Sequence, residues 1–136
     1  MTKILVVDDS PTSLAIANAM LSEAGHEVIT STSARSALAL LSKEPVDAII
    51  TDIEMPEMDG LEFIREVRRN FPRVPVIAMS GAPWGLTLLR LGKQGGACST
   101  LRKPLSEPEV AKAVAAATDV SRQTGSRQKP GDSKAR

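Results

Sequence analysis

The feature that most constrains this chain is the repeated alternation of a short apolar run with a segment of helical periodicity. The run "ILVV" at residues 4–7 opens the pattern, and a polar, helix-like stretch follows it. Continuous short apolar runs between helical segments are typical of strands buried on both faces of a parallel sheet. The predicted strands are Ile4–Val7, Val28–Thr30, Ala48–Thr51, Val74–Met79 and a weaker fifth, Cys98–Leu101.

Helix start signals lie between these runs. Ser10 precedes Pro11, Ser33 precedes a second helical periodicity, and Ser106 stands three residues before Glu109 in a capping-box pattern. Five βα units in succession imply one parallel sheet with helices on both faces and right-handed crossovers. The predicted helices cover about residues 11–24, 34–41, 59–67, 84–93 and 106–118.

Charge is distributed unevenly along the chain. Residues 120–136 hold five basic residues and one acid, and Gly, Ser and Gln replace the apolar periodicity there. We therefore predict one folded domain at 1–119 and a basic, flexible tail at 120–136. A contact of this tail with an acidic partner or nucleic acid is the alternative. No aromatic residue accompanies the basic ones, so base stacking has no support and no direct DNA binding is expected.

Cysteine usage and hydropathy favour the cytoplasm. Cys98 is the single cysteine, so no internal disulfide can form. The first residues lack the basic region, apolar stretch and cleavage site of a signal peptide. No apolar run approaches the length of a membrane span, and we expect no membrane contact.

Polar residues follow four of the predicted strands at the point where each one ends. Asp8 and Asp9 follow the first strand, Asp52 the third, Ser80 the fourth and Lys103 the fifth. The carboxyl ends of parallel strands meet at one edge of a sheet, and open α/β sheets bind their ligands there. We therefore expect three carboxylates, a hydroxyl and an ammonium group to converge at this edge.

Adjacent carboxylates at the end of a buried strand call for a cation, because desolvation and like-charge repulsion both disfavour the Asp8-Asp9 pair. Mg²⁺ prefers oxygen ligands and often combines one or two carboxylates with a substrate phosphate. Asp52 could then serve as a carboxylate nucleophile, and Ser80 and Lys103 could hydrogen-bond and neutralise the phosphoryl oxygens. Taken alone, the Asp pair could merely favour a helix N-terminus, and Ser80 could lie in an ordinary turn.

With these residues in view, the chain resembles the response-regulator receiver domains, of the single-domain, CheY-like kind. The resemblance covers about residues 3–118 and implies a flavodoxin-like (βα)5 fold with a doubly wound five-stranded parallel sheet in the order 2-1-3-4-5. The motifs that carry it are "VVDDSP" at 6–11, "TDIEMPEMDG" at 51–60, "IAMSG" at 77–81 and "LRKPL" at 101–105.

The resemblance implies a metal site. Asp8, Asp9 and Asp52 would bind Mg²⁺ together with the backbone carbonyl of Glu54.

It also implies a phosphoryl-transfer site. Asp52 would be the phosphoacceptor, with a histidine kinase or phosphotransfer protein as the donor. Ser80 would be the switch hydroxyl that moves to meet the phosphoryl group, and Lys103 would contact the group from the other side. Pro104 would follow a cis peptide bond.

The implied function is a stand-alone response regulator receiver in a two-component phosphorelay. Such a protein is a phosphoprotein switch in signal transduction rather than an enzyme, since it only phosphorylates itself from donors and loses the aspartyl phosphate slowly. Its expected partners are the phosphodonor and a separate effector or kinase target. We expect a monomer or weak dimer.

Several positions depart from the family pattern. Thr100 stands where the fifth strand usually carries Tyr or Phe, which predicts weaker or different coupling of phosphorylation to the surface around that strand. Glu54 and Ala82 offer no side-chain amide to hydrolytic water, and Glu54 could either repel anionic donors or bind the metal at rest. Gly85 and Gly92 predict a mobile or shortened fourth helix, because Gly costs roughly 1 kcal/mol relative to Ala.

Other functions are weighed against this one. A phosphorylation-independent receiver-like interaction module is favoured by Thr100 and opposed by the intact phosphoacceptor. A Mg²⁺-dependent phosphatase of the haloacid-dehalogenase kind needs a second acid two residues after its nucleophile, which Asp52 and Glu54 imitate only loosely. Nucleotide binding has no support, because no glycine-rich phosphate loop follows the first strand.

Overall fold

The computed structural model describes residues 2–55, 60–82 and 85–123, in which strands and helices alternate along the chain. The strands are β1 (Lys3–Val7), β2 (Glu27–Ser31), β3 (Ala48–Asp52), β4 (Val76–Ser80) and β5 (Ser99–Arg102). The helices are α1 (Pro11–Glu23), α2 (Ala34–Lys43), α3 (Gly60–Asn70), α4 (Gly85–Gly95) and α5 (Glu107–Gln123).

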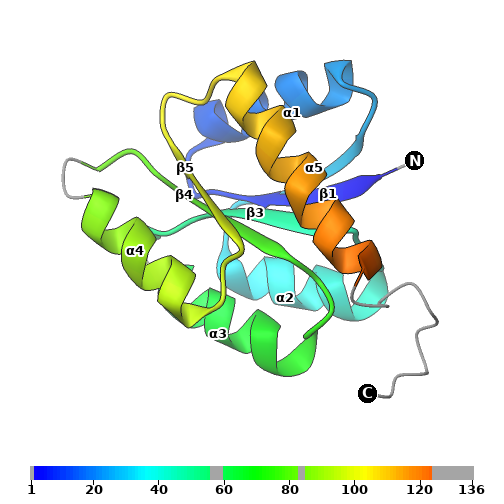
Figure 1. Cartoon of the computed structure of the whole chain (residues 1–136), viewed down its shortest axis with the longest axis vertical. Coiled ribbons are helices and arrows are strands. Elements are labelled where there is room, and N and C mark those ends of the chain that lie inside the picture. Colours follow the sequence, from blue (N-terminus) through cyan, green and yellow to red (C-terminus); the bar gives the residue numbers. More distant parts are fainter. Residues whose placement is uncertain (1, 56–59, 83–84, 124–136) are drawn as a thin grey trace.

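The strands in the described part of the chain form a single parallel sheet in the order β2-β1-β3-β4-β5. This order confirms the predicted fold class. Figure 1 shows α1 and α5 on one face of the sheet and α2, α3 and α4 on the other. The central strands β3 and β4 are buried along their whole length, which is why their sequences are almost continuously apolar.

Two hydrophobic layers lie between the helices and the sheet. Successive side chains of a strand point to opposite faces and pack in opposite layers. Leu5 packs in the layer under α2, α3 and α4, while Ile4 packs in the layer under α1 and α5. Phe63 of α3 and Val114 of α5 occupy the corresponding helix positions. Each fully buried aliphatic side chain of this kind contributes roughly 1.5–3 kcal/mol.

The predicted helix caps are present. Ser10 Oγ accepts a hydrogen bond from the backbone N–H of Ser13 at 3.2 Å, and Ser33 Oγ accepts one from Ser36 at 3.1 Å. Such caps satisfy amides that the first turn leaves unpaired and are worth about 1 kcal/mol each. They fix where α1 and α2 begin, immediately after the strand ends that carry the polar residues.

Helix α5 runs further than the periodicity predicted, to Gln123 rather than to about Thr118. Its last residues contain no Gly or Pro to stop it, although they are polar. The helix crosses the predicted division between 1–119 and 120–136, and that division stays a prediction. The predicted helix starts at Asp59 and Trp84, and tail residues 124–136, lie outside the described residues.

Helix α4 is eleven residues long, so the predicted shortening is wrong. Gly85 and Gly92 are both buried, on the side of the helix that faces the sheet. A Cβ atom at Gly85 would lie 2.7 Å from Ser80 Oγ and 2.9 Å from Arg102 Nη1. The glycine therefore lets the helix approach the ends of β4 and β5 closely. Mobility of this helix stays a prediction.

The hydropathy expectation can be tested on these helices. None of those in the described ranges combines the length and apolar character that a membrane crossing requires.

Candidate functional site

The register of the sheet brings two aspartates side by side. Val7 of β1 and Thr51 of β3 are aligned partners, and the next residue of each chain segment is Asp8 or Asp52. Asp8 is fully buried, and Asp52 is only 4% exposed. Asp9 lies just beyond the strand end and is exposed. Residues that are 44 positions apart in sequence therefore share one edge of the sheet.

The three carboxylates form a compact oxygen cluster. One oxygen from each of Asp8, Asp9 and Asp52 lies within 4.8 Å of the others. Asp52 Oδ1 is buried and has no hydrogen-bond partner among the described residues. Leaving a buried carboxylate oxygen without a partner costs free energy, so a ligand that binds this atom gains affinity. A hard divalent cation with oxygen ligands, as predicted from the sequence, fits this donor set.

Lys103 contacts two of the three carboxylates in the cluster. Its ammonium Nζ donates to Asp8 Oδ2 at 2.7 Å and lies 3.5 Å from Asp52 Oδ2. It also donates to the hydroxyl of Ser13 at 3.3 Å. The peptide bond between Lys103 and Pro104 is cis, as the resemblance implied. The ammonium group therefore partly neutralises the two buried carboxylates when no metal is bound.

The electrostatics of the cluster are dominated by burial. The pKa of Asp52 is raised from 3.8 to about 7, mainly because the carboxyl group is desolvated and also because of the charge of Asp8, with the charge of Lys103 opposing both effects. Partial burial lowers the pKa of Lys103, but its hydrogen bond to Asp8 and the charges of Asp52 and Asp8 outweigh that effect. The net result is a pKa of Lys103 above its usual value. Lys103 therefore stays a cation, while Asp52 is poised near neutral pH.

The hydroxyl of Ser80 forms a hydrogen bond with a residue outside this cluster. Ser80 is fully buried, and its hydroxyl donates a hydrogen bond to Glu54 Oε2. The hydroxyl oxygen of Ser80 also accepts a hydrogen bond from the backbone N–H of Ala82 at 3.3 Å. From the sequence, the Glu54 side chain could either repel anionic donors or bind the metal. In the structure it accepts a hydrogen bond from Ser80 instead.

Comparison with known families agrees with this geometry. The sequence matches the family model for the response regulator receiver domain over residues 4–115. The chain belongs to the response regulator receiver domain family. Proteins of this family work in two-component signal transduction, and the predicted family assignment is confirmed.

Similar proteins include both long and short chains. The two-component response regulator ARR11 of Arabidopsis thaliana is 40% identical over 110 residues, which are 79% of this chain and 21% of that protein. Protein PilH of Pseudomonas aeruginosa is 32% identical over 116 residues, which are 84% of this chain and 95% of that protein. This receiver domain thus spans a quarter or less of the length of several curated relatives.

Solved structures share the fold. The crystal structure of a response regulator receiver domain protein from Clostridium thermocellum superposes with a TM-score of 0.85 at 30% identity, covering 91% of this chain and 99% of that one.

A close approach of α3 fixes the chain after Asp52 in the receiver domain. The backbone N–H of Gly60 donates to the carbonyl of Ile53 at 2.8 Å. A Cβ atom at Gly60 would meet the Ile53 backbone and lie 2.5 Å from the carbonyl oxygen of Asp52. Only glycine fits there without displacing this backbone. Pro56 and the other residues of this loop up to 59 lie outside the described residues.

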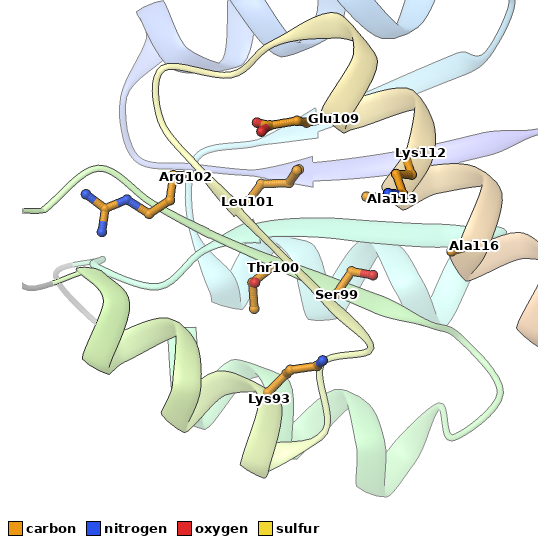
Figure 2. Close-up of a pocket in the computed structure, with 9 residues that line it drawn as sticks. All are labelled: Lys93, Ser99, Thr100, Leu101, Arg102, Glu109, Lys112, Ala113 and Ala116. Atoms are coloured by element: carbon orange, nitrogen blue, oxygen red, sulfur yellow. The ribbon is translucent and has the colours of Figure 1, made fainter.

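Thr100 lies in a groove of about 390 Å³ between α4, β5 and α5. Figure 2 shows Lys93 on the α4 side, Lys112 on the α5 side, and Arg102 extending away from the middle of the groove. Thr100 of β5 and Ala113 of α5 are two of the small residues in its lining. The receiver domain therefore has a basic hollow beside Thr100.

Two residues near the site were not predicted from the sequence. Ser13 contacts the Lys103 ammonium, and Arg102 Nη1 lies close to Gly85. Ser13 could have been found from the sequence, because it lies in the first turn of a helix that begins at a strand end. The position of Arg102 could not have been found in this way, since only the packing of α4 on the sheet brings Arg102 and Gly85 together.

Proposed function

We propose that this receiver domain is a phosphorylation switch that accepts a phosphoryl group on Asp52 from a histidine kinase or phosphotransfer protein. The observation that carries the proposal is the buried Asp52 Oδ1, which has no described hydrogen-bond partner and lies in an oxygen cluster opposite Lys103. The Asp52 carboxylate attacks phosphorus through one of its oxygens, and the P–N bond of the phosphohistidine donor breaks as the imidazole leaves and takes up a proton from solvent.

The residues around Asp52 divide the remaining work. When bound by Asp8, Asp9, Asp52 and the backbone carbonyl of Glu54, Mg²⁺ would supply positive charge to the transferring phosphoryl oxygens. Lys103 provides a second cation from the opposite side, preorganised by its contact with Asp8. Ser80 donates a hydrogen bond to the phosphoryl group after transfer. The protein is a switch rather than an enzyme, since its own aspartate is the group modified.

The switched surface is proposed to act on separate proteins. The match to PilH over 95% of that protein's length supports a receiver whose effector is a separate protein. The groove beside Thr100 has three cations in its lining, Lys93, Arg102 and Lys112, and one acid, Glu109. This balance favours an effector segment with acidic residues. A monomer or weak dimer and a cytoplasmic location stay predictions.

Mass spectrometry of the intact protein tests the chemistry. Incubation with Mg²⁺ and acetyl phosphate should add one phosphoryl group, and Asp52→Asn or EDTA should abolish the addition. If the wild-type protein shows no adduct and does not bind beryllofluoride, which mimics the phosphoryl group, the proposal is wrong. A phosphorylation-independent interaction module, to which Thr100 also points, would then be the better account. Turnover of a phosphate ester would instead indicate a phosphatase.

A further inference from the structure

The hydroxyl of Ser80 is already committed to another acceptor in this structure. It donates to the carboxylate of Glu54, although it lies at the end of β4 next to the strand that carries Asp52. A serine hydroxyl has one proton, so it can donate to only one acceptor at a time. Ser80 therefore cannot hydrogen-bond a phosphoryl group while it donates to Glu54.

We propose that Glu54 is a positioning residue that holds Ser80 in the unphosphorylated state and sets how readily the switch operates. A phosphoryl group on Asp52 must replace the Glu54 carboxylate as the acceptor of the hydrogen bond that the Ser80 hydroxyl donates. This inference rests on the proposed function, because it concerns the same phosphoryl site. It gives the Glu54 side chain a role that is separate from the role of its backbone carbonyl.

The surroundings of the pair make this competition significant. Ser80 is fully buried and Glu54 is half-buried, so the hydrogen bond between them is shielded from water. A hydrogen bond to a charged carboxylate is about twice as strong as one between neutral groups. The Ala82 backbone N–H fixes the Ser80 oxygen from the other side, at 3.3 Å. Releasing Ser80 therefore costs free energy that the phosphoryl group has to supply.

Two other roles for the Glu54 side chain make different predictions. If its charge simply repels anionic donors, removing it will strengthen anion binding whether or not Ser80 is present. If its carboxylate is a ligand of Mg²⁺, removing it will weaken Mg²⁺ binding. If it acts through Ser80, its effect on anion binding requires the Ser80 hydroxyl.

A double-mutant cycle separates these roles. The four proteins are the wild type, Glu54→Ala, Ser80→Ala and the double variant, and alanine at position 54 keeps the backbone carbonyl in place. The Kd of beryllofluoride is measured for each at saturating Mg²⁺ by ¹⁹F NMR, and Mg²⁺ binding is titrated separately. We expect Glu54→Ala to tighten beryllofluoride binding about tenfold when Ser80 is present, and to leave the Kd unchanged in the Ser80→Ala background.

Matched variants complete the experiment. Glu54→Gln keeps an acceptor without the charge, so it should tighten binding less than Glu54→Ala does. Glu23→Ala removes an exposed acid at the far end of α1 and should leave the Kd unchanged. Equal tightening with and without Ser80, no tightening, or weaker Mg²⁺ binding would each overturn the inference while the proposed function stands. Failure of the wild type to bind beryllofluoride or take up a phosphoryl group would overturn both.

Discussion

At the scale of single residues, the buried carboxyl group of Asp52 governs the electrostatic behaviour of the metal-free protein. Its pKa is raised from 3.8 to about 7 by burial together with the charge of Asp8, and the charge of Lys103 opposes this rise. The folded protein therefore binds this proton more tightly than the unfolded chain does. Between about pH 4 and pH 7 the free energy of unfolding falls as pH rises, and above about pH 7 this contribution is constant.

Replacing Asp52 with Asn should remove that pH dependence. In EDTA at pH 8 we expect Asp52→Asn to be more stable than the wild type by about 2–4 kcal/mol, because it no longer buries a charge. Near pH 4 the difference should become small, since the wild-type carboxyl group is then protonated in the folded protein. Urea unfolding at a series of pH values measures both quantities.

The exposed Asp47 provides a matched control for this prediction. Its side chain accepts a hydrogen bond from the backbone N–H of Lys3 at 2.8 Å, and an Asn oxygen can accept the same bond. Asp47→Asn should therefore leave the free energy of unfolding at pH 8 almost unchanged. An Asp52→Asn stabilisation that is the same at pH 4 and pH 8 would show that burial of the charge is not its cause.

At the scale of secondary-structure elements, the strands could be predicted because their apolar runs, capping serines and terminal polar residues are local signals. For this reason Ser10 could be predicted as a helix cap, and Asp8 as the residue that follows the first strand. The effect of Gly85 could not, because it depends on what a Cβ atom would meet in other strands rather than on helix propensity. The Glu54–Ser80 contact escaped prediction for a related reason: adjacent strand ends predict proximity but not which way a side chain turns.

The closeness of α4 to the sheet gives a test at this scale. Gly85→Ala would place Cβ 2.7 Å from Ser80 Oγ and 2.9 Å from Arg102 Nη1. We expect a loss of about 1–3 kcal/mol in the free energy of unfolding, which outweighs the helix-propensity gain of up to about 1 kcal/mol. Gly95→Ala in the same helix is the control, because no described atom outside its neighbours lies within 4 Å of a Cβ there. Urea unfolding should separate the two variants, and equal stabilities would refute the steric explanation.

At the scale of the whole molecule, the acidic cluster is attached to the centre of the sheet. Asp8 and Asp52 extend from β1 and β3, which are neighbours in the middle of the strand order. Lys103 follows the edge strand β5 and reaches back to both carboxylates. The buried strands that carry the aspartates also separate the two hydrophobic layers, so the cluster cannot persist when the sheet unfolds.

Mg²⁺ should therefore stabilise the entire sheet and not only the loops at its edge. A ligand that binds only the folded state at 100 times its Kd adds about 2.7 kcal/mol to the free energy of unfolding. Amide protons in the central strands, such as those of Ile50 and Ile77, exchange through global unfolding and should exchange about a hundredfold more slowly under these conditions. Hydrogen exchange followed by NMR measures this effect, with sodium chloride at equal ionic strength as the control for screening. Asp52→Asn should lose most of the slowing, because it removes a charged ligand from the cluster. Slowing confined to amides at the strand ends, with Ile50 unchanged, would mean that the cluster can open while the sheet remains folded.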